Sequence, residues 1–190
     1  MRAAWRVTVA AVVEPERLLF VDECGTHTSM APIHGYAPRG ERLRLSVPRK
    51  RGKNTTLLAS MTIEGMGPSL ALEGATTAVV FEAYVEKVLA PGLKEGQVVV
   101  MDNLGAHRPK RVRELIEERG AKLLYLPSYS PDYNPIEEAF AKLKDLLRNA
   151  AARTKGALVE AIGVALSAVS AQDARGYFEH AGYRSPAHLL

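Results

Sequence analysis

The sequence predicts an α/β fold in which helices flank a mixed β-sheet. Two observations predict it. Up to about residue 75, short apolar runs alternate with turns, and beyond that point helical and strand patterns alternate. A strand meander followed by strand–helix alternation produces a mixed sheet with helices on both faces. This order of elements is that of a ribonuclease H-like fold.

The first half is predicted to form strands. Residues 17–23 (RLLFVDE) are an apolar run that ends in acid. In residues 42–47 (RLRLSV) basic and apolar residues alternate, which is typical of a half-exposed strand with its arginines on one face. Residues 55–63 and 69–72 flank the hairpin-like turn EGMGP. Together these runs predict an antiparallel meander.

The second half is predicted to alternate. A spacing of four between apolar residues predicts helices, and the β-branched run QVVVM predicts a buried strand. The expected elements are helix 76–89, strand 97–101, helix 109–119, strand 122–126, a helix from about 134 to 150, and a last helix over 154–170.

Size and composition narrow the class of protein. The chain has 190 residues, of which 47% are hydrophobic and 24% charged, so disordered and fibrous classes are excluded. Its single cysteine, Cys24, excludes an internal disulfide framework and a zinc site built from several thiolates. No apolar run approaches the ~18 residues of a membrane helix. We therefore expect a cytoplasmic protein without a membrane partner.

Three acids follow predicted elements where they could meet. Asp22 ends the first strand, Asp102 ends the QVVVM strand, and Glu137 lies in the first turn of the helix that Asn134 and Pro135 open. Carboxylates at the ends of neighbouring strands lie about 5 Å apart. Such acids repel one another unless a cation joins them, and Mg²⁺ prefers carboxylate oxygens. The acids therefore predict a site for Mg²⁺ or Mn²⁺.

Each acid also has a purely structural interpretation. Asp22 can simply mark the end of a strand, and Asp102, followed by Asn103 and Gly105, can sit in a turn. Asn134 and Glu137 have the spacing of a capping box, in which the glutamate needs no metal. The combination of two acids at strand ends with a third at a helix start favours a functional site.

A basic tract and a histidine are candidate nucleic-acid contacts. Residues 39–53 are dense in Lys and Arg and contain one glutamate, which favours a phosphate backbone as partner; the alternative is a solvated hairpin. His107 follows Asp102 by five residues and could contact a phosphate or a metal-bound water, or else only bond to the backbone. The chain has a net charge of +4, which is compatible with a polyanion but proves none.

The catalytic domains of DDE transposases resemble this chain in four segments: VDECGTH, GYAPRGER, VVVMDNLGAH and LPSYSPDYNPIEEAFAKLK. The resemblance runs over roughly residues 18–148 and is closest to the bacterial insertion-sequence branch of the mariner superfamily. The 34 residues between Asp102 and Glu137 match the spacing of that branch. The resemblance implies that Asp22, Asp102 and Glu137 are the metal-binding catalytic triad. It also implies that Lys144 faces DNA.

This resemblance implies a transposase catalytic domain that cleaves DNA strands and transfers them to target DNA in a metal-dependent reaction. We expect residues 1–16 to be an extension, 17–150 the catalytic domain, and 151–190 a helical segment packed on it. The expected partners are DNA, a second copy on that DNA, and a separate helix-turn-helix domain or chain. The residues expected to contact DNA are Arg49, Lys50, Arg51, Lys53, His107, Lys142 and Lys144.

Two other functions remain open from the sequence. The chain could be a catalytically silent DNA-binding or subunit-interaction remnant of a truncated transposase. It could also be a stand-alone nuclease of the same fold, which would cut DNA but never join strands.

Overall fold

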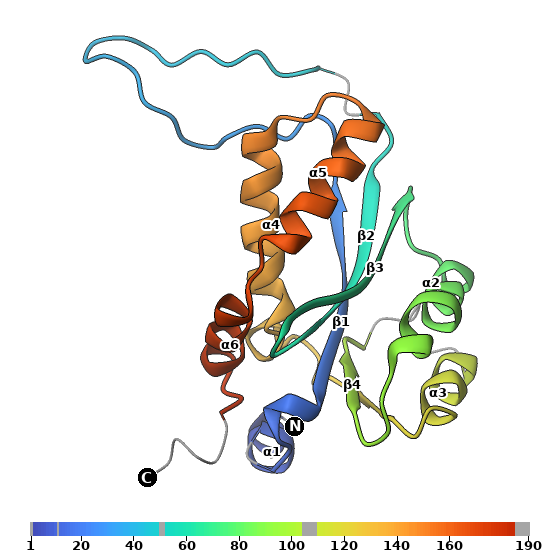
Figure 1. The fold of residues 1–190 in the computed structure, drawn as a ribbon. Helices are drawn as coiled ribbons and strands as arrows, with labels where there is room; N and C mark the ends of the chain where they lie inside the picture. Colours follow the sequence, from blue (N-terminus) through green and yellow to red (C-terminus); the bar gives the residue numbers. More distant parts are fainter. Residues whose placement is uncertain (1, 11, 50–51, 104–109, 185–190) are drawn as a thin grey trace.

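A five-stranded mixed sheet forms the centre of the molecule, with the strand order β3-β2-β1-β4-β5 (Figure 1). The computed structural model describes residues 2–10, 12–49, 52–103 and 110–184. β1 pairs antiparallel with β2 and parallel with β4; β2–β3 is antiparallel and β4–β5 is parallel. The strands are β1 (Leu18–Thr26), β2 (Thr55–Thr62), β3 (Gly65–Glu73), β4 (Val98–Met101) and β5 (Lys122–Tyr125).

Helices cover both faces of the sheet, as predicted (Figure 1). The α-helices are α1 (Arg2–Trp5), α2 (Ala78–Tyr84), α3 (Lys110–Glu117), α4 (Ile136–Ala150), α5 (Lys155–Ser167) and α6 (Ala171–His180). Shorter helical turns are η1 (Arg6–Ala10), η2 (Pro15–Arg17), η3 (Val85–Leu89), η4 (Ala90–Gly92) and η6 (Pro131–Tyr133). The helices α4, α5 and α6 lie on one face, and α2 and α3 on the other.

The central strand β1 divides its side chains between two cores because successive residues of a strand point to opposite faces. Leu18 and Phe20 pack with residues of α4, α5 and α6. Leu19 and Val21 pack with residues of α2 and α3. A strand buried on both faces reads as a continuous apolar run, which is why its sequence predicted it well.

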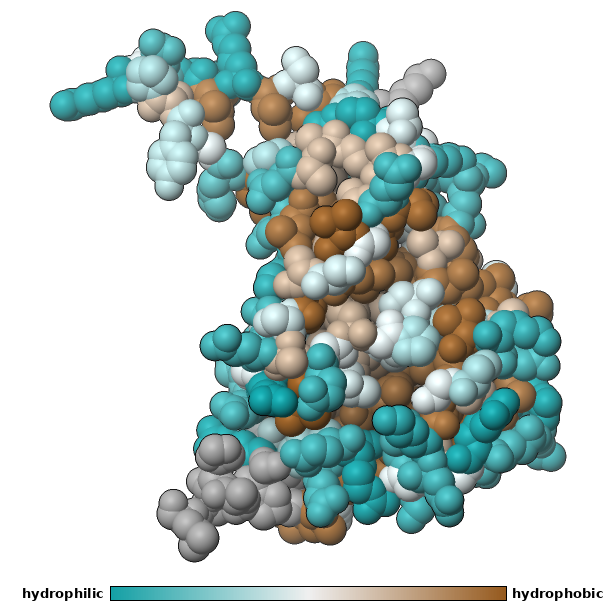
Figure 2. Space-filling view, viewed as in Figure 1, coloured by the Kyte–Doolittle hydropathy of each residue, from teal (hydrophilic) through white to brown (hydrophobic). Residues whose placement is uncertain are grey.

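The predicted strand over residues 42–47 is wrong. Residues 31–49, here called the basic arm, form no helix or strand and extend away from the sheet (Figures 1 and 2). Leu43 and Leu45 are 53% and 55% exposed. The alternating pattern gives the segment an apolar face, but this face neither pairs with a described strand nor packs into a described core.

Other predicted boundaries shift. β1 continues past Asp22 to Thr26, so Asp22 lies within the strand and does not end it. β3 begins at Gly65, inside the predicted EGMGP turn. The predicted last helix corresponds to α5, and α6 follows it as a separate helix. The sequence signal for α6 was a capping box, in which Ser170 and Asp173 satisfy one another's backbone amides.

Among the described helices, no single one is long and apolar enough to cross a membrane. Taken together, α5 and α6 reach the length and apolar composition of a membrane span, but the two helices meet at a bend of 75°.

The end of α4 offers a stabilising substitution. Ala151 caps the helix with φ 48° and ψ 38°, a left-handed conformation that is unfavourable for any residue with a Cβ atom. Ala151→Gly is therefore expected to raise the free energy of unfolding by about 1 kcal/mol in urea titration. The control is Ala152→Gly. Ala152 does not have a positive φ, so this substitution should destabilise the protein. A lower stability for Ala151→Gly would contradict this account.

The contact between Lys142 and Asp173 predicts a pH-dependent stability. The hydrogen bond from Lys142 (2.7 Å) and the bonds from Ser170 lower the pKa of Asp173 from 3.8 to about 2. A carboxylate with a depressed folded-state pKa stabilises the protein above its unfolded pKa, and this contribution is lost as the pH falls. Asp173→Asn should therefore lower the urea midpoint at pH 7, and the difference from the native protein should shrink between pH 4 and pH 2. Glu179→Gln, on the exposed side of α6, should show no such trend.

Candidate active site

The register of β1 and β4 brings two of the predicted acids together. Val21 of β1 pairs with Met101 of β4 at the end of the parallel ladder. Asp22 and Asp102 are the residues that follow this last pair in the sequence. Neighbouring strands lie about 4.8 Å apart, so both carboxylates start from adjacent backbones. The prediction that these acids come from neighbouring central strands is confirmed.

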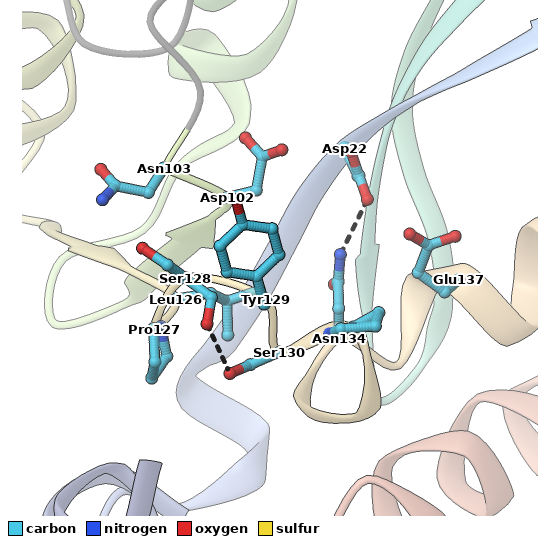
Figure 3. A pocket seen from close by; sticks show the side chains of 11 residues that line it. Asp22, Asp102, Asn103, Leu126, Pro127, Ser128, Tyr129, Ser130, Asn134 and Glu137 are labelled. Atoms are coloured by element: carbon cyan, nitrogen blue, oxygen red, sulfur yellow. Dashed lines mark hydrogen bonds between the residues drawn. The ribbon is translucent and has the colours of Figure 1, made fainter. Parts of the chain in front are cut away.

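The third acid approaches from α4. Glu137 lies in the first turn of that helix, whose apolar stripe (Ile136, Phe140, Leu143) is buried against the sheet. The packing of α4 therefore sets where its amino end lies. All three acids border one open pocket of about 400 Å³ (Figure 3). The other lining residues are Asn103, Leu126, Pro127, Ser128, Tyr129, Ser130, Pro131 and Asn134.

Asp22 is the most enclosed of the three, with 7% of its surface exposed. Its Oδ1 accepts a hydrogen bond from the backbone N–H of Glu23 (2.7 Å), and its Oδ2 accepts one from Nδ2 of Asn134 (2.8 Å) (Figure 3). Asp22 thus enters the pocket with both carboxylate oxygens held by hydrogen bonds.

The capping-box interpretation of Asn134 and Glu137 is wrong. The residue that caps α4 is Pro135, and no side chain caps the helix. The Asn134 side chain reaches Asp22 instead, 112 positions away in the sequence. Glu137 is exposed at the pocket and makes no hydrogen bond or ion pair with another described side chain.

The loop of residues 128–134 forms one wall of the pocket, and the amino-terminal segment holds it. Tyr129 has φ 55°, an unfavourable conformation for a bulky residue. The Arg2 guanidinium donates to the Tyr129 carbonyl oxygen (2.9 Å) and to Ser130 Oγ (3.0 Å), and pairs with Asp132 (2.6 Å). Sequence reasoning treated residues 1–16 only as an extension and missed this support.

A buried hydrogen-bond chain supports the same loop from below. Trp5 Nε1 donates to the Tyr183 hydroxyl (2.9 Å), which donates to the Tyr133 carbonyl oxygen (2.7 Å). Burial is the main cause that raises the pKa of Tyr183 well above its usual value, so its hydroxyl stays protonated and can donate. These two hydrogen bonds link residues near both ends of the sequence to the pocket loop.

Removing one hydroxyl from this chain has a predictable effect. Tyr183→Phe leaves the Trp5 N–H and the Tyr133 carbonyl without their partner, and a buried unpaired polar group costs about 1–3 kcal/mol. We expect a loss of unfolding free energy of that size in urea titration. Tyr177→Phe, on α6 just before Tyr183 in the sequence and half-buried, is the matched control and should change stability by less than about 0.5 kcal/mol. Equal losses of stability in the two variants would contradict a stabilising role for the hydrogen bonds of the Tyr183 hydroxyl.

Cys24 lies on β1, two residues after Asp22, and Lys144 lies on α4 with Glu137. Burial is the main cause that raises the pKa of the Cys24 thiol to about 11, with Asp22 and Glu137 adding to the rise and Lys144 opposing it. Cys24 is buried, and it packs as a small apolar residue of the core. Lys144 lies on α4, seven residues after Glu137, and does not line the pocket.

Among the described residues, the others expected to contact DNA do not line this pocket. Arg49 is exposed on the basic arm. Lys53 pairs with Glu73 (3.0 Å) and lines a different pocket together with Glu23. Lys142 is engaged by Asp173. Lys50, Arg51 and His107 lie outside the described residues.

The donor set of the pocket suits a hard divalent cation. Three carboxylates offer the oxygen ligands that Mg²⁺ and Mn²⁺ prefer, and the pocket is open enough to admit water and a phosphate. In the described part of the chain, no three His, Cys, Asp or Glu side chains already converge on one point as an ion would require. The acids thus share a pocket but are spaced more widely than a single coordination sphere.

Comparisons with known proteins show the family and the fold of the chain. The family model described as DDE superfamily endonuclease matches residues 17–159. A pre-cleavage Mos1 transpososome has a similar structure, with a TM-score of 0.71 and 15% identity over 95% of this chain and 56% of the Mos1 chain. The Mos1 paired-end complex with the left transposon end gives a TM-score of 0.72 and 16% identity, over 95% and 55% of the chains.

The isolated catalytic domain of Mos1 mariner transposase gives a TM-score of 0.63 at 16% identity, over 95% of this chain and 82% of that one. These similarities confirm the ribonuclease H-like fold. The chain spans little more than half the length of the first two Mos1 chains. No curated protein sequence gives a match. Because the family model covers most of the chain, including all three acids, the chain belongs to the DDE superfamily of endonucleases.

Proposed function

We propose that this chain is the catalytic part of a transposase, which cuts DNA strands and joins them to target DNA with the help of Mg²⁺ or Mn²⁺. The observation that carries the proposal is that Asp22, Asp102 and Glu137 border one open pocket in a chain of the DDE endonuclease family. The Mos1 structures support it, because they include complexes with transposon ends and paired-end complexes with Mn and with Mg.

Asp22, Asp102 and Glu137 would hold the cation in this reaction. A bound divalent cation would polarise the phosphodiester and stabilise charge on the attacking and leaving oxygens. The chain's own task is to place the acids. The β1–β4 register fixes two of them, and the packing of α4 brings the third over the same pocket. Lys144, on the same helix as Glu137, would neutralise a phosphate of the DNA.

The two chemical steps use the same pocket. In cleavage, a water oxygen bonds to phosphorus, and the bond from phosphorus to the 3′-oxygen of the element end breaks. The 3′-oxygen leaves with a proton, as a hydroxyl. In transfer, that hydroxyl attacks a target phosphodiester, a new bond from phosphorus to the element's 3′-oxygen forms, and the target's own 3′-oxygen leaves with the proton. The protein contributes positioning and electrostatic stabilisation.

The test is a strand-cleavage and strand-transfer assay on oligonucleotides, with Mg²⁺, with Mn²⁺ and with a chelator. We expect metal-dependent products from the native chain and none from Asp102→Asn. Cleavage without joined strands would indicate a nuclease of the same fold, and salt-dependent DNA binding without cleavage would indicate a silent remnant. Equal cleavage by the native chain and Asp102→Asn would refute the assignment of the acids.

We propose further that two copies act together on DNA and that a helix-turn-helix domain or chain outside this sequence reads the element ends. The basic arm supports pairing, because it exposes Ile33, Tyr36, Leu43 and Leu45, and exposed apolar residues on one segment mark interaction surfaces. Coverage of little more than half of the Mos1 chain supports a separate reading domain. Light scattering with and without DNA, on the native chain and on a chain with a shortened arm, tests the pairing.

A further inference from the structure

Asn134 contacts Asp22 through a buried amide that is only half satisfied. Asn134 is 5% exposed, and its Nδ2 lies 2.8 Å from Asp22 Oδ2. Its Oδ1 is also buried, and this oxygen has no hydrogen-bond partner in the described part of the chain. Buried polar atoms in native proteins are nearly always paired, so this exception needs a reason.

The orientation of the amide follows from chemistry. An ionised carboxylate only accepts hydrogen bonds, so the NH₂ group of Asn134 must face Asp22. Turning the amide over would set two oxygens against each other. An apolar side chain of similar size would leave no unpaired oxygen in this loop. The Asn134 side chain therefore donates a hydrogen bond to Asp22 although its own carbonyl oxygen stays buried without a partner in the described part of the chain.

The backbone of Asn134 connects this donor to the third acid. The Asn134 N–H donates to the Pro131 carbonyl oxygen (2.9 Å), and the Asn134 carbonyl oxygen accepts from the N–H of Glu137 (3.1 Å). One residue thus ties the pocket loop to the first turn of α4 through its backbone and to β1 through its side chain. Asp22 and Glu137 are held relative to one another through Asn134.

We propose that Asn134 is a positioning residue that holds the Asp22 carboxylate in the direction needed to bind a divalent cation. The inference deepens the proposed function and rests on it for the identity of the cation. Asn134 Nδ2 and the Glu23 N–H each donate to a different oxygen of the Asp22 carboxylate, which fixes the plane of the carboxylate. Partners of this kind, one step behind a metal ligand, typically change metal affinity by about 10–100-fold when they are removed.

Mn²⁺ titration of the protein without DNA tests this role, with water-proton relaxation as the readout. Asn134→Ala should weaken Mn²⁺ binding by about 10–100-fold. Two controls separate positioning from simple damage to the loop. Tyr183→Phe weakens the support of the same loop without touching Asp22. Asn149→Ala removes the same residue type from an exposed position on α4. Both controls should keep Mn²⁺ affinity within about twofold of the native value.

The outcomes are distinct. Weak Mn²⁺ binding by Asn134→Ala alone supports the proposal. Native affinity in Asn134→Ala, an equal loss in Tyr183→Phe, or no Mn²⁺ binding by the native protein overturns it. Circular dichroism at the titration temperature verifies that each variant is folded. If the variants behave as expected but the native chain neither cleaves nor joins DNA, the failure concerns the proposed function and leaves the role of Asn134 standing.

Discussion

Asp22→Asn is expected to reduce metal-dependent strand cleavage by about 10³-fold or more, which corresponds to roughly 4 kcal/mol of transition-state stabilisation. The substitution keeps the shape of the side chain but removes one negative charge from the pocket. Asparagine offers one neutral carbonyl oxygen where the carboxylate offered two charged ones, and hard cations bind such a site weakly. The loss should appear in the turnover of a saturated substrate, measured from oligonucleotide products on a gel.

The matched control for this substitution is Asp145→Asn on the exposed side of α4. It removes the same charge from the same chain away from the pocket and should retain nearly native cleavage. Because Asp22 is buried, the melting temperature of Asp22→Asn is measured alongside. Cleavage within tenfold of the native rate in a folded variant would show that Asp22 does not hold the cation.

Phe20→Ala is expected to lower the free energy of unfolding by about 3–5 kcal/mol, the typical loss for a large buried aromatic residue. Phe20 is fully buried on β1. Its ring lies 5.3 Å from the ring of Phe178 in an edge-on arrangement and 5.1 Å from that of Tyr183. Removing it opens a cavity between the sheet and α6, where the surrounding side chains can only partly relax. Domains are typically stable by about 5–15 kcal/mol, so most of the margin would be lost.

Urea unfolding followed by circular dichroism measures this loss. Val159→Ala on α5 is the control, because Val159 is 49% exposed and its truncation should change stability by less than about 0.5 kcal/mol. A loss below about 1 kcal/mol for Phe20→Ala would mean that the core around α6 is loosely packed.

The elements that the sequence predicted well are those whose local pattern and tertiary environment agree. The QVVVM run is β-branched and is buried on both faces as β4. The α4 stripe repeats at helical spacing and packs on the sheet as expected. The acids could be placed because Asp22 and Asp102 directly follow the last pair of the parallel β1–β4 ladder, and the start of α4 borders the same pocket.

The elements that failed depend on partners far away in the sequence. The 42–47 pattern is that of a strand, yet it lacks a neighbour to pair with. In sequence, Asn134 cannot be told from a helix cap, because only the fold shows that Asp22 lies within its reach. The contacts of Arg2 and Trp5 join the first residues of the chain to residues near 130 and 183. No local pattern encodes such contacts.

The basic arm also determines how a protease would divide the molecule. Trypsin cuts after Arg and Lys, and the arm presents exposed Arg39, Arg42, Arg44 and Arg49 on irregular backbone. The two sides of such a cut stay joined, because β1 and β2 remain paired from Phe20–Met61 to Thr26–Thr55. Brief digestion should therefore give two fragments that separate under denaturing conditions but elute together as one folded particle.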